Sequence, residues 1–173
     1  MRKTLAGLVF GTALLVVAMP CEAQRPFGGG ISAGVSIPIS DLSKSHETGY
    51  NAAAHVRINL PILPLTLRLE GFYNKLGARV DDIVGDPGFR IAGGNLDLIY
   101  TFGGMPIRPY VIGGAGFYNV KYIRGSSTDV GFNAGLGAKF RLARVGTFAE
   151  ARLHMIRDER RFQFVPMTFG FEF

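Results

Sequence analysis

The residues that could take part in acid–base chemistry include His154, which lies four positions after Glu150. A histidine and a carboxylate can serve as a general base and the group that orients it, but they also need a nucleophile. No serine lies beside this pair in the sequence. We therefore predict that the protein is not an enzyme and that the fold satisfies the polar atoms of His154.

Metal and cofactor chemistry has little support in the sequence. Asp81, Asp82 and Asp86 lie in one polar stretch and could offer oxygen ligands to calcium, but their spacing is not that of a calcium loop. The stretch is better explained as a solvated loop. Cys21 is the single cysteine, which excludes a disulfide framework and a cysteine zinc cluster. We expect no metal and no cofactor.

The overall charge does not indicate a nucleic-acid partner. The 173 residues carry a net charge of +6, yet the basic residues form no continuous tract. Hydrophobic residues make up 47% of the chain, so it is not expected to be disordered.

Ionisable residues instead recur at every second position of several segments. Apart from two histidines, the residues in this pattern have five positive and four negative side chains, so the charges of the set nearly cancel. We predict a buried polar network made of His55, Arg57, Arg68, Glu70, Asp97, Lys139, Arg141, Glu150, Arg152, His154 and Glu172.

Strict alternation of apolar and small or polar residues dominates the chain from Gly30 onward, and it indicates β-strands. Eight segments show it, and most are near the 9–11 residues that a tilted strand needs to cross a bilayer. The sequence predicts an all-β fold, an eight-stranded antiparallel up-and-down transmembrane β-barrel. Its strands are expected at residues 30–39, 51–60, 65–74, 92–102, 110–122, 132–141, 148–155 and 165–173.

The connections between these segments are predicted to alternate in length, as in membrane barrels with short periplasmic turns and longer outer loops. The long polar loops are expected at residues 40–49, 77–88, 124–129 and 157–161, and the short turns at 61–64, 103–106 and 143–144.

Residues 1–23 resemble a cleaved signal peptide, which leaves 24–173 as the barrel domain. Arg2 and Lys3 form a charged start, an apolar run follows, and small residues precede a cut after Ala23. An N-terminal membrane anchor and a lipoprotein modified at Cys21 are the alternatives. Pro20, directly before Cys21, fits the lipoprotein signal poorly.

Alternation alone does not say which face points inward. A soluble lipocalin-like barrel would bury its apolar face, whereas a membrane barrel turns it toward lipid. Three features favour the membrane barrel: the apolar face is nearly free of charge, glycines lie beside long charged groups on the other face, and aromatic rings sit near strand ends. These rings are Tyr73, Tyr100, Phe102, Tyr122, Phe140, Phe171 and Phe173.

The end of the chain resembles the C-terminal signal of bacterial outer-membrane barrels, with Met167, Phe169, Phe171 and Phe173 at alternate positions. Residues 108–116, Arg-Pro-Tyr-Val-Ile-Gly-Gly-Ala-Gly, resemble a strand of the outer membrane protein β-barrel domain family, which includes OmpA-like, OmpX-like and opacity-like barrels. The resemblance covers residues 27–173.

The resemblance implies insertion into the outer membrane by the barrel assembly machinery, with outer-membrane lipid and lipopolysaccharide as surroundings. We also expect a monomer with no periplasmic domain after the barrel. Some barrels of this kind are lipid A deacylases or palmitoyltransferases. The deacylase resemblance would require His-x-Ser, which His46, His55 and His154 all lack.

Antiparallel pairing allows contacts in the lumen to be predicted. A turn centred between Ile62 and Leu63 sets Arg57 opposite Arg68 and His55 opposite Glu70, while the turn near Ala143 sets Lys139 about opposite Glu150. Because buried charge survives only when paired, the network is interpreted as a structural plug. A gated path for small ions and an adhesin role of the outer loops are the alternatives.

Overall fold

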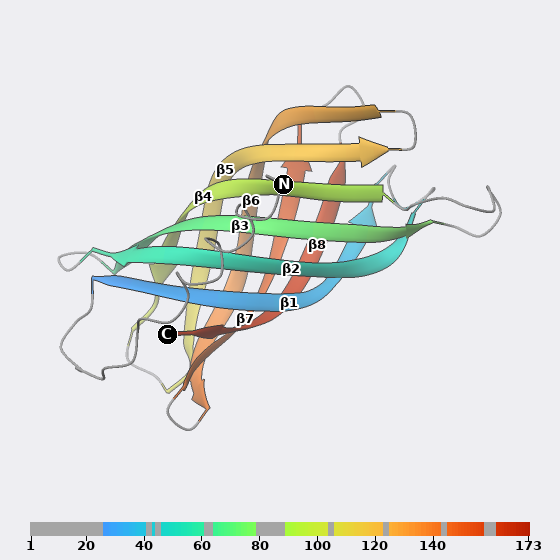
Figure 1. The fold of residues 1–173 in the computed structure, drawn as a ribbon. Coiled ribbons are helices and arrows are strands. Elements are labelled where there is room, and N and C mark those ends of the chain that lie inside the picture. The colour runs from blue at the N-terminus through green and yellow to red at the C-terminus, as the bar shows by residue number, and fades with distance from the viewer. Residues whose placement is uncertain are drawn as a thin grey trace, which may run out of the picture.

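The computed structural model describes residues 26–40, 43, 46–60, 64–78, 89–103, 106–122, 125–142, 145–157 and 162–173. Each strand pairs with the next in antiparallel fashion, and the last pairs with the first, so the sheet closes into the predicted barrel (Figure 1). The strands are β1 (Phe27–Ile39), β2 (His46–Asn59), β3 (Leu65–Ala78), β4 (Phe89–Thr101), β5 (Arg108–Tyr122), β6 (Gly125–Leu142), β7 (Val145–Ile156) and β8 (Gln163–Glu172).

Helices of membrane-spanning length and hydropathy do not occur in these ranges.

The register gives the barrel its stagger. Starting from Ile31, the paired residues lead through β2, β3, β4 and β5 to Val130 on β6. In the other direction they lead through β8 and β7 to Phe140 on the same strand. The offset is ten residues, so the strands are tilted around a narrow interior that side chains can fill.

We call the two ends of the barrel the closing end and the loop end. At the closing end β1 begins, β8 ends and residues 60–64, 102–107 and 143–144 connect strands. At the loop end the connections are residues 40–45, 79–88, 123–124 and 157–162. Figure 1 shows the C-terminus at the end where β1 starts.

The alternating pattern places the faces as predicted. Leu136 on β6 is 67% exposed on the outer face, whereas a Cβ added to the next residue, Gly137, would collide with the ring of Tyr110 in the lumen. Large apolar side chains such as Phe132 and Phe169 are likewise exposed on the outside. The soluble lipocalin-like arrangement is therefore wrong for this chain.

The predicted loop at residues 124–129 is wrong. β5 and β6 stay paired through Asn119 with Thr128 and Tyr122 with Gly125, which leaves residues 123–124 as the connection. β2 likewise begins at His46, within the predicted first loop. The polar pattern marks where the apolar band ends, but the backbone hydrogen bonds of paired strands continue beyond it. The connections between the strands therefore alternate in length less clearly than predicted.

Several predicted features lie outside the described residues. They are the leader, Cys21, the turn residues 61–63, the pair 143–144 and the three loop aspartates. The side chains of His46 and Tyr122 also lie outside what is described.

Candidate functional site

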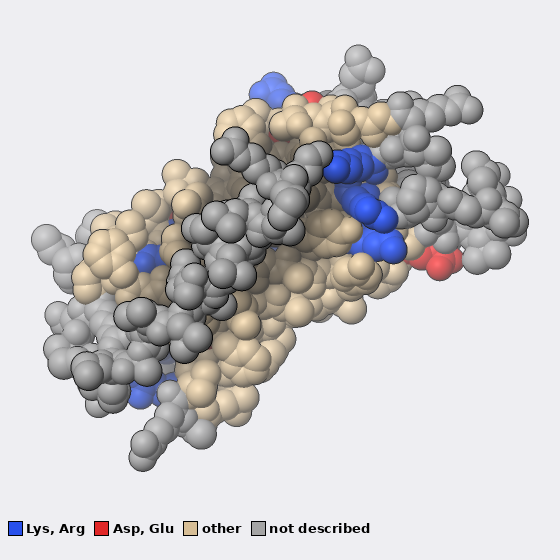
Figure 2. Space-filling model, in the orientation of Figure 1, with Lys and Arg blue, Asp and Glu red and all other residues tan. Residues whose placement is uncertain are grey.

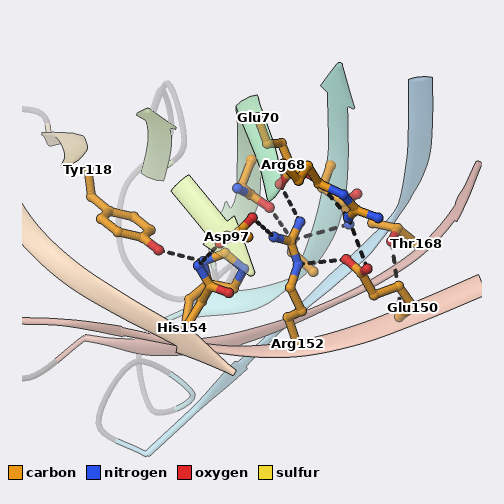
Figure 3. Close-up of polar contacts among 12 residues, drawn as sticks. Arg68, Glu70, Asp97, Tyr118, Glu150, Arg152, His154 and Thr168 are labelled. Atoms are coloured by element: carbon orange, nitrogen blue, oxygen red, sulfur yellow. Dashed lines mark hydrogen bonds and ion pairs between the residues drawn. The ribbon is translucent and has the colours of Figure 1, made fainter. Parts of the chain in front are cut away.

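The lumen is the candidate site, because inward-facing residues of neighbouring strands bring most of the chain's buried charge together there. Arg152 on β7 occupies its centre (Figure 3). Its Nη1 lies 3.1 Å from Asp97 Oδ2, its Nε lies 2.7 Å from Glu150 Oε1, and its Nη2 contacts Glu70. One guanidinium therefore joins carboxylates from β3, β4 and β7, and all four side chains are almost completely buried.

Arg68 on β3 is the second cation of this layer. Its Nη1 lies 3.0 Å from Glu150 Oε2 and 3.6 Å from Glu70 Oε2. Tyr110 donates a 2.6 Å hydrogen bond to the same Glu150 oxygen. The Arg68 guanidinium also lies 5.3 Å from the centre of the Phe148 ring. Glu150 thus receives donors from three side chains, which offsets the cost of burying its charge.

A smaller cluster lies toward the closing end. Glu172 on β8 accepts from Arg57 at 3.1 Å and lies 3.1 Å from the Lys139 ammonium. Lys139 also lies 5.6 Å from the centre of the Tyr110 ring. Tyr110 therefore links the two charged layers, because its hydroxyl belongs to the first and its ring to the second.

The predicted partner of Lys139 is wrong. Lys139 is opposite Phe148 in the register and Glu150 is opposite Gly137. Leu142 pairs with Val145, so the residue opposite Lys139 is displaced by two positions, from Glu150 to Phe148. Lys139 instead forms its ion pair with Glu172 on β8, one strand further around the barrel.

The register between β2 and β3 is as predicted, with Arg57 opposite Arg68 and His55 opposite Glu70. The ion pairs nevertheless run across the lumen, with Arg57 on Glu172 and Glu70 on Arg152. Arg141 lies one residue before the end of β6 and is exposed, so it sits at the rim.

Above the charges, toward the loop end, the lumen becomes aromatic. Tyr118 Oη lies 2.8 Å from His154 Nδ1, and the His154 ring stacks on Phe164 at 4.9 Å between centroids. Phe72 meets the same histidine edge to face at 5.8 Å. His55, lower in the barrel, packs against Phe148 at 5.6 Å. His154 is therefore enclosed by rings, whereas His55 contacts one ring. His154 Nε2 has no hydrogen-bond partner among the described residues, so the expectation that the fold satisfies all polar atoms of His154 is wrong.

An apolar cluster fills the loop end of the lumen. We call it the apolar cap; its buried members are Leu76, Phe89, Ile91, Tyr118, Val120, Ile156, Phe164 and Phe72.

Sequence reasoning missed this cap because it treated the inward face as polar. The available signal was a large apolar residue among the otherwise polar inward-facing positions of a strand, as at Phe72. Asn133, which donates a 2.7 Å hydrogen bond to Asp97, was missed for another reason. Neutral polar side chains at the inward-facing positions of the strands were not counted as network members.

In the described part of the chain, no group of three or more histidine, cysteine or acidic side chains is arranged to hold a metal ion; Glu70, Asp97 and Glu150 converge on Arg152 instead. Nor does any described serine hydrogen-bond a histidine.

The family model of the outer membrane protein beta-barrel domain matches residues 8–152. The chain belongs to this family. Together with the charge-poor outer face, this makes the protein an integral outer membrane barrel surrounded by lipid. Among curated proteins, none matches the sequence.

Solved structures of bacterial outer membrane barrels share the fold. Neisserial surface protein A matches with a TM-score of 0.66 and 14% identity, over 86% of this chain and 96% of that one. The N-terminal barrel of Pseudomonas aeruginosa OprF matches at 0.52 and 22%, over 84% and 97%. The outer membrane enzyme PagL matches at 0.55 and 15%, over 84% and 97%. The family fold thus accommodates both enzymes and proteins without a stated activity.

Proposed function

We propose that this outer membrane barrel is closed and non-conducting, and that it serves as a structural element and a surface platform for its loop-end connections. The observation that carries the proposal is the succession of two blocking layers along one lumen. A charge-balanced ion-pair network lies toward the closing end, and the apolar cap lies toward the loop end.

The charged layers are balanced. Four cations, Arg57, Arg68, Lys139 and Arg152, face four carboxylates, Glu70, Asp97, Glu150 and Glu172. An ion crossing this region would have to displace a partner from a pair, which leaves an uncompensated buried charge and costs about 3–5 kcal/mol. An eight-stranded barrel is also just wide enough for its own side chains. Both facts argue against the gated ion path.

The cap adds a second barrier of a different kind. Leu76, Ile91 and Val120 are fully buried. A hydrated ion would lose water there without gaining polar contacts, which is more costly than passage through a polar constriction.

Non-enzymatic function is part of the proposal. His154 touches Phe72 and Phe164, which carry no nucleophile, and Tyr118, whose side chain is completely buried and therefore out of reach of a substrate. A single chain also completes the sheet, because β1 pairs with β8, so a monomer needs no second copy to close.

Potassium release from lipid vesicles tests the proposal. We expect vesicles that contain the folded barrel to lose potassium at the same rate as protein-free vesicles. A release rate that rises in proportion to the ratio of protein to lipid would contradict it.

A further inference from the structure

Three cations lie side by side on the outer face of the barrel near the loop end. Lys75 on β3 is paired with Arg90 on β4, and Arg90 is paired with Lys121 on β5. Alternation turns all three outward, and Arg90 and Lys121 are exposed. We call Lys75, Arg90 and Lys121 the cation row. Figure 2 shows it as a continuous blue patch over these strand ends.

The cation row forms no ion pair with the described residues, whose ion pairs all lie inside the lumen. The nearest acidic residue by register is Glu47, which is opposite Gly77, two residues beyond Lys75 at the end of the row. Like charges directly opposite each other destabilise paired strands. Because the lumen charges cancel, the excess positive charge of the chain lies outside the lumen. An external anion would turn this repulsion into attraction.

The height of the row matches that of a membrane surface. On the same three strands, Leu65, Tyr100 and Val111 are paired side by side in the same way. Each of them lies ten residues along its strand from one of the cations, toward the closing end. At about 3.3 Å per residue and a tilt of about 40°, ten residues rise about 25 Å, the height of the lipid-facing band. The cation row therefore lies where acyl chains end and head groups begin.

The surface below the row suits a lipid that carries an anion. Tyr73 projects outward two residues before Lys75, where aromatic rings favour the interface. Beside it lie small outward residues, Ala92 and Gly94 on β4 and Gly71 on β3, so an acyl chain can approach the backbone. A Cβ at Gly71 would meet nothing within 4 Å.

We propose that the cation row binds the phosphate groups of the phosphorylated glycolipid of the outer leaflet, lipopolysaccharide. One phosphate can bridge two neighbouring cations, and Arg90, in the middle of the row, can hold it with two parallel hydrogen bonds. The inference does not depend on whether the lumen conducts.

A matched pair of single variants tests the site. Arg90→Gln and Arg108→Gln remove the same charge from exposed arginines near the starts of β4 and β5, at opposite ends of the barrel. The readout is the dissociation constant of lipopolysaccharide for the folded barrel in neutral lipid nanodiscs. We expect Arg90→Gln to weaken binding about tenfold and Arg108→Gln to leave it unchanged. Equal effects of the two variants would overturn the proposal.

Three further probes identify what the row binds. Native lipopolysaccharide is expected to bind, and enzymatically dephosphorylated lipopolysaccharide to bind about tenfold more weakly despite identical acyl chains. Equal binding of the two would overturn the phosphate assignment. The other two probes are phosphatidylglycerol and a soluble sulfated polysaccharide. If either bound more tightly than lipopolysaccharide and lost binding in Arg90→Gln, the glycolipid assignment would be overturned in favour of that anion.

Discussion

Gly29 and Phe173 exchange both of their backbone hydrogen bonds, each 2.9 Å long. Phe173 is the last residue of the sequence, and the pairing of β8 with β1 runs from Ile39 with Gln163 up to this pair. In lipid, each unpaired backbone group would cost several kcal/mol. The exchange therefore completes the seam that closes the barrel.

The Phe173 ring is expected to matter more for assembly than for stability. Phe173→Ala keeps both backbone hydrogen bonds and removes only the ring, which is 71% exposed. Because the terminal aromatic resembles the signal read by the barrel assembly machinery, we expect several-fold less folded barrel in cells. In detergent, the free energy of unfolding should change by less than about 1 kcal/mol. Equal cellular yields at equal expression would contradict the signal role.

Leu136 tests the assignment of the faces. Leu136→Arg places a charge on the outer face within the apolar band. It should destabilise the barrel folded in bilayers by about 2–4 kcal/mol. Leu136→Ala is the control for lost apolar area. A loss below about 0.5 kcal/mol for the arginine variant, measured by a folding titration in lipid vesicles, would mean that Leu136 does not face lipid.

Gly137 tests how tightly the lumen is filled. A side chain at this position would collide with the Tyr110 ring and displace the hydroxyl from Glu150. Gly137→Val should destabilise the barrel by about 1–3 kcal/mol. Ala138→Val, on the lipid-facing side of the same strand, should change stability by less than about 0.5 kcal/mol. If both variants unfolded at the same denaturant concentration, the lumen around Tyr110 would be looser than described.

Lys139 tests the corrected pairing. A double-mutant cycle of Lys139→Met with Glu172→Gln should give a coupling free energy above about 1 kcal/mol, because the ion pair is direct and 93% of each side chain is shielded from solvent. The cycle of Lys139→Met with Glu150→Gln, which connect only through Tyr110, should give less than half of that. The reverse order of the two coupling energies would restore the partner expected from the sequence.

The strands and their faces could be predicted because apolar residues at every second position mark the face of each strand that contacts lipid. Leu136 and Gly137 illustrate this, since neighbouring residues meet opposite environments. The start of β6 could not be predicted, because residues 125–129 are small or polar on both faces and the pattern fades while the backbone ladder with β5 continues.

The partners within the lumen could not be predicted from hairpin register alone. Arg57 and Glu172 meet across β1, and Arg152 reaches Glu70 across the interior. Such contacts depend on the ten-residue stagger of the closed barrel, which belongs to no single hairpin. The cation row was hidden in the same way, because its members lie far apart in the sequence and meet only through the register.

The central claim, a lumen closed by ion pairs and by the apolar cap, is tested most directly by electrical recording from the folded barrel in a planar lipid bilayer. The account predicts a current indistinguishable from that of the protein-free bilayer at either polarity, after insertion has been verified by the altered gel mobility of the unheated, folded barrel. Stepwise increases of conductance that recur with each insertion would contradict it.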